Sequence, residues 1–210
     1  MDSTDTVIAG VTLLLIVPLL LMEIPAYRKG GYNAEFWKKP LDERLDHIAA
    51  HPDSWTRMGA IWLPILVLSV AGTMAFSFQL AAKGAETWAF LAMGAYIAGS
   101  AAWLIGSLIQ TTAVRVAAQV RAQTGTTPDW LDAGWTIVWW SEITYVIAAN
   151  VAFIAWGVGM LDSGFPADWM GWAAIALGVI ALLLVGLARE AFPHLGVIVP
   201  IVLGIALVAY

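Results

Sequence analysis

Two acidic residues lie inside long apolar stretches of the sequence, where an ionisable side chain is costly and usually has a function. Glu142 belongs to the segment WWSEITY, residues 139–145, and Glu23 lies near the end of an earlier apolar stretch. A helix would place Glu142 and Tyr145 on the same face, because they are three residues apart. Carboxyl groups in this setting bind ligands or relay protons. The sequence therefore predicts a polar site around Glu142, of the kind that a proton-coupled permease uses.

Arg115 and Asn150 are further candidates for this site. Arg115 follows the third apolar stretch, where it would supply a counter-charge to Glu142, and Asn150 lies further along the stretch that holds Glu142. A structural role is the alternative for these side chains, because polar groups in membrane helices commonly form hydrogen bonds with a neighbouring helix. For Glu23 the alternative is a carboxyl group that extends to the membrane interface.

His47 and His51 have the i, i+4 spacing that allows two imidazoles on one helix to hold a metal ion. Glu43 or Asp46 would be the third ligand. The same residues also suit the polar face of an amphipathic helix, and they lack the central glutamate of the HExxH pattern. We therefore expect no metal, with His47 and His51 as the candidate ligands if one binds.

The cofactor classes that commonly occur in membrane helices find no ligands here. No histidine lies inside an apolar stretch, which argues against an intramembrane haem held by two histidines. No lysine lies in the middle of one, which argues against a retinal Schiff base. The sequence contains no cysteine, which excludes an iron–sulfur cluster ligated by thiolates.

Twelve tryptophans are present, and most lie near the ends of apolar stretches, where indole rings prefer the headgroup region. Trp103, Trp139, Trp140 and Trp156 lie deeper. Two interpretations are open for these four: packing inside the protein, or the aromatic wall of a pocket for an apolar or cationic ligand.

The composition indicates which elements must position these residues. The 210 residues are 60% hydrophobic and 12% charged, with a mean hydropathy of +0.80, whereas soluble domains carry about 25% charged residues. A lipid-embedded helical bundle satisfies its own backbone hydrogen bonds. We therefore expect an all-α integral membrane protein with one domain, residues 1–210. The net charge of −5 offers no basic surface for nucleic acid.

Six apolar stretches approach the length of about 20 residues that a helix needs to cross the bilayer. We expect kinks or compensating contacts at Pro18, Pro64 and Pro200, because proline removes a helical hydrogen bond. The first stretch lacks the basic flank of a signal peptide and is interpreted as a retained span. The predicted spans are 7–26, 58–82, 88–112, 134–160, 169–188 and 195–210.

The distribution of basic residues predicts the orientation, because cytoplasmic loops carry an excess of Lys and Arg. Nine of the ten basic residues fall in the first, third and fifth loops, and Lys83 alone falls on the other side. Both termini are therefore expected on the non-cytoplasmic side of the cell membrane. The nine are Arg28, Lys29, Lys38, Lys39, Arg44, Arg57, Arg115, Arg121 and Arg189.

The two long cytoplasmic connections also have recognisable patterns. Leu41, Leu45 and Ile48 recur at helical spacing between two prolines, which predicts an amphipathic helix on the membrane surface. The third loop begins as a polar extension of the third span and breaks at TGTTP, residues 124–128. Small residues at four-residue spacing, such as Ala95 with Gly99, predict close packing of the third and fourth spans.

Three functions remain open at this stage. The first is a small transporter or ligand-binding protein with a cytoplasm-facing cavity around Glu142. The second is an accessory subunit of a larger membrane complex, and the third is a membrane enzyme that acts on lipids. Because no catalytic motif is present, we favour a protein that is not an enzyme. Its expected partners are membrane lipids and either copies of itself or subunits of a complex.

Overall fold

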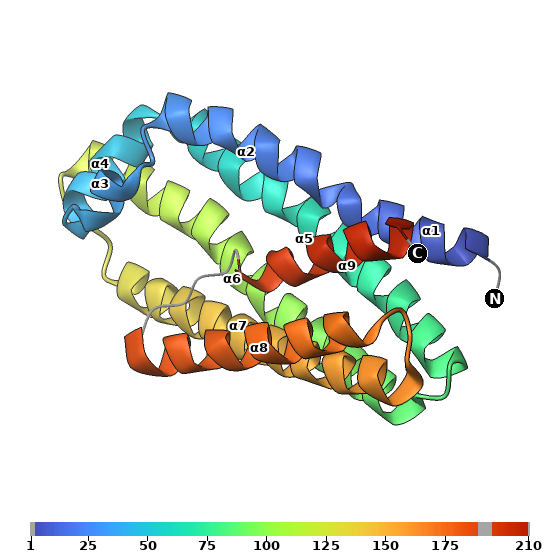
Figure 1. The fold of residues 1–210 in the computed structure, drawn as a ribbon. Coiled ribbons are helices and arrows are strands. Elements are labelled where there is room, and N and C mark those ends of the chain that lie inside the picture. Colours follow the sequence, from blue (N-terminus) through green and yellow to red (C-terminus); the bar gives the residue numbers. More distant parts are fainter. Residues whose placement is uncertain (1–2, 189–194, 210) are drawn as a thin grey trace.

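The structure, a computed structural model, describes residues 3–188 and 195–209, which form helices joined by short turns (Figure 1). Arg189 and His194, together with the final residue of the predicted sixth span, lie outside the described residues. The helices are α1 (Ser3–Leu14), α2 (Ile16–Gly30), α3 (Ala34–Lys38), α4 (Leu41–Ala50), α5 (Pro52–Ala82), α6 (Glu86–Thr124), α7 (Trp130–Ser163), α8 (Asp168–Ala188) and α9 (Leu195–Ala209).

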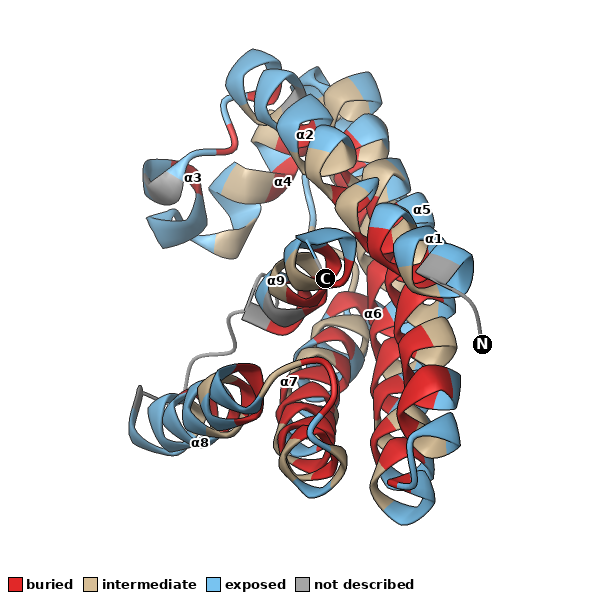
Figure 2. Cartoon of the chain, turned by 45° about the vertical axis from the view of Figure 1, so that its right-hand side comes forward, coloured by how far each residue is buried: buried red, intermediate tan, exposed pale blue. Residues whose placement is uncertain are grey.

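The predicted all-α membrane bundle is confirmed. Five helical segments of the described chain are long and apolar enough to cross a membrane: Thr4–Gly30, Pro52–Ala82, Glu86–Thr124, Trp130–Ser163 and Asp168–Leu187. Buried residues concentrate on α5, α6 and α7, whereas exposed residues cover the outward faces of α2 and α8 (Figure 2). Large apolar side chains such as Val67 and Leu187 point outward. This outward apolar surface is typical of a multi-pass membrane protein.

The last helix coincides with the predicted sixth span over the described residues, and it is short, as the sequence predicts. α9 contains 15 residues, a length of about 22 Å at 1.5 Å per residue, against about 30 Å of hydrocarbon. It lies between α1 and α7 (Figure 1). Its first turn packs against the middle of α7, because a Cβ atom on Gly196 would lie 2.4 Å from the Tyr145 hydroxyl. α9 thus begins inside the bundle.

Pro18 breaks the first span as the sequence predicts. α1 ends at Leu14 and α2 begins at Ile16, which is where proline deprives the carbonyl of residue 14 of its helical partner. Pro64 and Pro200 instead lie inside the continuous helices α5 and α9.

The middle helices extend well beyond the predicted spans at one end of the bundle. α6 contains 39 residues, about 58 Å at 1.5 Å per residue, and therefore continues past the hydrocarbon region. It stops where the sequence predicts, at Gly125, whose φ of 75° closes the helix in the left-handed conformation that glycine tolerates. This extension gives α4 a protein surface on which to pack.

The predicted amphipathic helix forms as α4, but its apolar face is covered by protein. Leu45 and Ile48 are buried in a cluster that includes Val114 and Ala117 of α6. The expectation that this face would rest on lipid is therefore wrong, because the long α6 occupies that place. On the polar side Arg121 of α6 lies 2.8 Å from an oxygen of Asp46.

Aromatic side chains join α3 and α4 to the start of α5, and we call these two short helices the cap. The Tyr32 ring packs edge-to-face on Phe36 and Trp55, and its hydroxyl donates to the carbonyl of His51 at 3.1 Å. Burial raises the pKa of Tyr32 to about 12, so that the hydroxyl keeps its proton and its donor role at neutral pH.

Small residues set the distances between the long helices. A Cβ atom on Gly99 of α6 would lie 2.8 Å from that of Ala148 on α7, and one on Gly106 would lie 2.8 Å from that of Ser141. The predicted close packing of the third and fourth spans is thus observed. A Cβ atom on Gly10 of α1 would likewise lie 3.0 Å from the carbonyl oxygen of Gly204 on α9.

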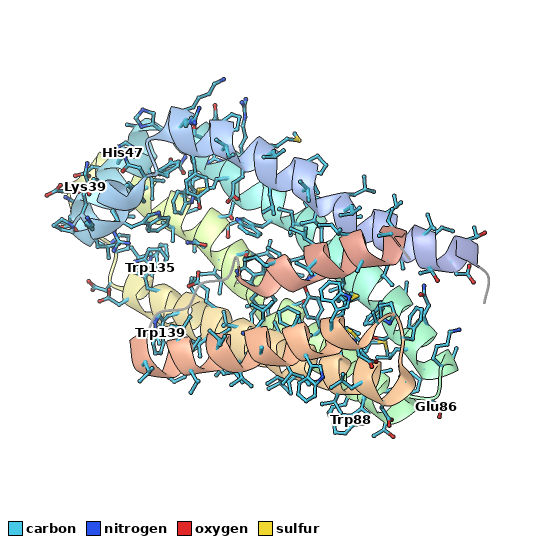
Figure 3. All side chains as sticks on the ribbon, in the orientation of Figure 1. Lys39, His47, Glu86, Trp88, Trp135 and Trp139 are labelled. Carbon is cyan, nitrogen blue, oxygen red and sulfur yellow. The ribbon has the colours of Figure 1, made fainter. Side chains whose placement is uncertain are left out.

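The bundle has two chemically different ends, shown by the labelled side chains in Figure 3. Lys39 and His47 lie at the end that carries the cap, and Glu86 and Trp88 lie at the opposite end. The beginning of α1 and the end of α9 also lie at the opposite end (Figure 1). Of the described Lys and Arg residues, Lys83 alone stands on a loop at that end.

Candidate functional site

Glu23 lies on the inner face of α2 and is buried, with 5% of its surface exposed. Its carboxyl group is within hydrogen-bonding reach of the Tyr27 hydroxyl, one turn further along α2, and of the Trp62 indole of α5. Both groups donate to it. A buried carboxyl group requires such donors, since isolation from water is otherwise costly. Glu23 therefore belongs to a built polar site and does not extend to the membrane interface.

Glu142 approaches the same place from the other side of the bundle. It is half-buried on α7, and its charge acts on the Tyr27 hydroxyl. The charges of the two acids, on α2 and α7, thus both act on Tyr27. Glu23 lies near the end of its span and Glu142 near the start of its own. Because the two helices run in opposite directions, both acids lie in the same half of the bundle, as the sequence predicts.

Aromatic rings connect the two acids. Trp62 meets Trp103 of α6 edge-to-face, with 4.6 Å between ring centroids. Trp103 in turn stacks on Tyr145 of α7, with 4.5 Å between centroids and 19° between planes. Because Tyr145 lies one turn from Glu142, four helices contribute to the site. The acid site, as we define it, consists of Glu23, Tyr27, Trp62, Trp103, Glu142 and Tyr145.

Tyr145 is fully buried at the deep end of the acid site. Its hydroxyl lies within reach of the Tyr96 hydroxyl on α6. It faces Tyr96 of α6, which donates to the carbonyl of Gly196 at the first turn of α9. The start of the short helix α9 therefore closes the acid site on that side.

Arg115 does not act as the predicted counter-charge to Glu142. Its guanidinium donates to the Thr56 hydroxyl at 3.0 Å and joins α6 to the start of α5. In residues 3–188 and 195–209 the ion pairs join Lys38 to Glu35 and Arg121 to Asp42 and Asp46, and Glu142 takes part in none of them. The sequence could not reveal this, because the rotation of α6 decides which helix Arg115 faces.

Asn150 is also separate from the acid site. It is buried nearer the opposite end of α7, and its amide donates to the carbonyl of Val146 in its own helix at 2.6 Å. Its backbone carbonyl lies beside Gly178 of α8. The structural interpretation of Asn150 is thus supported by its geometry.

Of the four deep tryptophans, two point inward and two point outward. Trp103 and Trp156 are buried, whereas Trp139 and Trp140 are 45% and 57% exposed. An aromatic wall next to Glu142 is therefore supplied by Trp103 and not by its sequence neighbours. Trp156 donates to the Ser77 hydroxyl at 2.8 Å and links α7 to α5.

His47 and His51 belong to the cap. A ring nitrogen of His47 bonds to the carbonyl of Gly30, and Nδ1 of His51 lies 3.1 Å from the carbonyl of His47. No group of three or more His, Asp or Glu side chains is arranged to hold a metal ion in the described chain. The geometry thus gives His47 a structural contact that fastens α4 to the end of α2.

No protein-family model matches this chain. No curated protein and no solved structure matches it significantly either. The interpretation of the acid site therefore rests on its own geometry: two carboxyl groups, two tyrosine hydroxyls and two indole rings that converge inside a membrane bundle.

Tyr27, Trp62 and Trp103 are the members of the acid site that the sequence did not single out as its components. One signal was available, since Tyr27 follows Glu23 at i+4 and must share its helical face. Trp62 stands close to the end of a predicted span and resembled an interfacial tryptophan. Only the packing of α5 against α2 shows that its ring turns inward.

Proposed function

We propose that this protein is a small multi-pass transporter that binds a cationic ligand, or a proton in its place, at the acid site. The observation that carries the proposal is that Glu23 and Glu142, on different helices, both act electrostatically on the Tyr27 hydroxyl. Two carboxyl groups attract a cation, and the faces of Trp62 and Trp103 favour an organic one through cation–π attraction. Intramembrane acids of this kind mark substrate and ion pathways.

The short α9 supports transport over static binding. Transporter sites often lie in the middle of the membrane, beside helices that begin or end inside the bundle. α9 begins against Tyr145 and not at the cap end. A short helix that starts inside the bundle can shift its position without the displacement of a complete membrane-spanning helix.

We also propose the orientation of the chain. The cap end carries eight Lys and Arg residues within the described ranges, against Lys83 at the other end, and basic loops remain in the cytoplasm. The cap then faces the cytoplasm, both termini face away from it, and the acid site lies in the cytoplasmic half of the bilayer of the cell membrane.

The test is a binding and uptake assay with the purified full chain. Binding of tetraphenylphosphonium is measured by calorimetry in detergent, and its uptake is measured in proteoliposomes. We expect Glu142→Gln to weaken binding at least about tenfold, since one charge-assisted contact contributes about 1.5–3 kcal/mol. Glu86→Gln, an exposed acid at the opposite end, is the matched control and should behave like the wild type.

Acidic pH gives a second readout, because protons and the cation compete for the same carboxyl groups. Binding should weaken as the pH falls, and Glu142→Gln should reduce that dependence. Benzoate, an aromatic anion, should not bind. Equal binding by the wild type and Glu142→Gln, with both proteins monodisperse, would contradict the proposal. Fixed partner proteins that co-purify in mild detergent would then favour an accessory subunit.

A further inference from the structure

A groove runs along the outer surface between α2 and α5, and Glu23 is not among the residues that line it. It has a volume of about 520 Å³ and is open to the surroundings. One helical face of α2 and one of α5 form its walls. The lining residues are Leu19, Met22, Pro25, Lys29, Ser54, Arg57, Ala60, Ile61 and Pro64.

The polar residues of the groove gather at the cap end. Lys29 closes α2, and Ser54 and Arg57 lie in the first turns of α5. Lys29 and Arg57 form no ion pair or side-chain hydrogen bond with a described residue, whereas Arg121 and Lys38 are both paired with acids. Two cations without an ion-pair partner among the described residues therefore line the groove at this end, together with Ser54.

The rest of the groove is apolar. From Lys29 to Leu19 the α2 wall covers eleven residues, and the ten steps between them rise about 15 Å at 1.5 Å per residue. This is about half of the 30 Å hydrocarbon thickness, which is the depth of one leaflet. The groove thus has a basic end and an apolar wall about one leaflet long. A phospholipid has a matching phosphate headgroup and an acyl chain of that length.

We propose that this groove binds one acidic glycerophospholipid from the leaflet next to the cap. Its phosphate lies between Lys29 and Arg57 and accepts a hydrogen bond from Ser54, and one acyl chain lies along Met22, Pro25 and Ile61. An acidic lipid is favoured because a zwitterionic headgroup would bring a further cation to a mouth that already holds two. Basic recesses between membrane helices bind such headgroups in this way.

Native mass spectrometry of the purified full chain tests the headgroup contact. The protein is titrated with dioleoylphosphatidylglycerol and, separately, with dioleoylphosphatidylcholine. We expect tighter retention of the first lipid, and about a fivefold loss for each cation removed, so that Lys29→Gln/Arg57→Gln binds it at least tenfold more weakly. The matched control is Arg28→Gln/Lys39→Gln, which removes the same charge from exposed positions outside the groove.

A second pair of variants tests the apolar wall. Met22 and Leu21 are 61% and 60% exposed, but only Met22 lines the groove. Met22→Trp should fill the groove and displace the bound lipid, whereas Leu21→Trp should leave it in place. Glycerol phosphate and inorganic phosphate, which lack acyl chains, should not compete at millimolar concentration.

Three results would overturn the proposal: equal retention of the two lipids, equal losses in the two charge variants, or complete displacement by inorganic phosphate. Cation binding at the acid site should be unaffected by Lys29→Gln/Arg57→Gln, because no member of the acid site lines the groove. The two proposals can therefore fail independently.

Discussion

Gly94 and Gly99 lie in the same helix, yet only Gly99 touches a neighbour. A Cβ atom on Gly99 would meet Ala148 at 2.8 Å and the Tyr145 carbonyl at 3.2 Å, whereas one on Gly94 would meet nothing within 4 Å. We expect Gly99→Val to lower the free energy of unfolding by about 1–3 kcal/mol through overpacking. Gly94→Val should change it by much less. Reversible unfolding in mixed micelles measures the free energy of unfolding of both variants. Equal decreases in the two would contradict the argument, because they would not depend on the contact of Gly99 with α7.

The buried hydrogen bond between Trp156 and Ser77 is a second residue-scale contact that can be measured. The indole donates to the Ser77 hydroxyl at 2.8 Å, and both side chains are fully buried. Ser77→Ala should cost about 1–3 kcal/mol, because it leaves the indole N–H without an acceptor. A double-mutant cycle with Trp156→Phe should give a coupling of about 0.5–1.5 kcal/mol. Strictly additive effects would contradict the bond, and Thr112→Ala, at an exposed hydroxyl, is the control.

At the scale of elements, α4 shows what a sequence pattern can and cannot specify. The spacing of its apolar residues predicted a helix from Leu41 onward, and the helix is present. The same spacing does not decide whether the apolar face of the helix packs on lipid or on protein, because both can cover an apolar stripe. The length of α6 decides between them: its extension past the third span was predicted, but the sequence did not show that Val114 and Ala117 of the extension would cover α4.

Docking of α4 on α6 should depend on Leu45. Leu45 is fully buried, and Leu45→Ala should weaken the docking by about 2–5 kcal/mol through lost burial and a cavity. Hydrogen exchange should then accelerate in Leu41–Ala50, with no change in the middle of α7, since the cap opens as a local unit. Leu41→Ala, at a half-buried position of the same helix, should have a smaller effect. An unchanged exchange rate in Leu45→Ala would mean that the ion pairs of Arg121 alone hold the cap.

At the scale of the whole molecule, the sequence predicted the class of fold and part of the acid site. Apolar length and composition were sufficient for five spans, because the bilayer imposes that length. The antiparallel order of spans placed Glu23 and Glu142 in the same half. Rotations about helix axes, which turn Arg115 toward Thr56 and Trp62 toward Glu23, depend on packing between helices and leave no periodic signal.

The proposed orientation can be tested on the whole molecule with single cysteines, because the chain has none of its own. Thr126 is exposed on the loop beside the cap, and Asp162 is exposed at the opposite end. In intact cells a membrane-impermeant maleimide should label Asp162→Cys and should label Thr126→Cys only after permeabilisation. The reverse pattern would place the acid site in the outer half of the bilayer.

The contact of α9 with α1 has a consequence for biosynthesis. Ala9 and Leu13 of the first helix are fully covered, and Gly10 meets Gly204 across the interface. The ribosome produces these partners almost a full chain length apart, which takes about 10–40 s at 5–20 residues per second. During that interval α9 has not yet been made. The face of α1 that it later covers must contact lipid or the insertion machinery instead. Chains that end before α9 should therefore be recognised by quality-control proteases, because the surface of α1 that α9 covers stays without its protein partner.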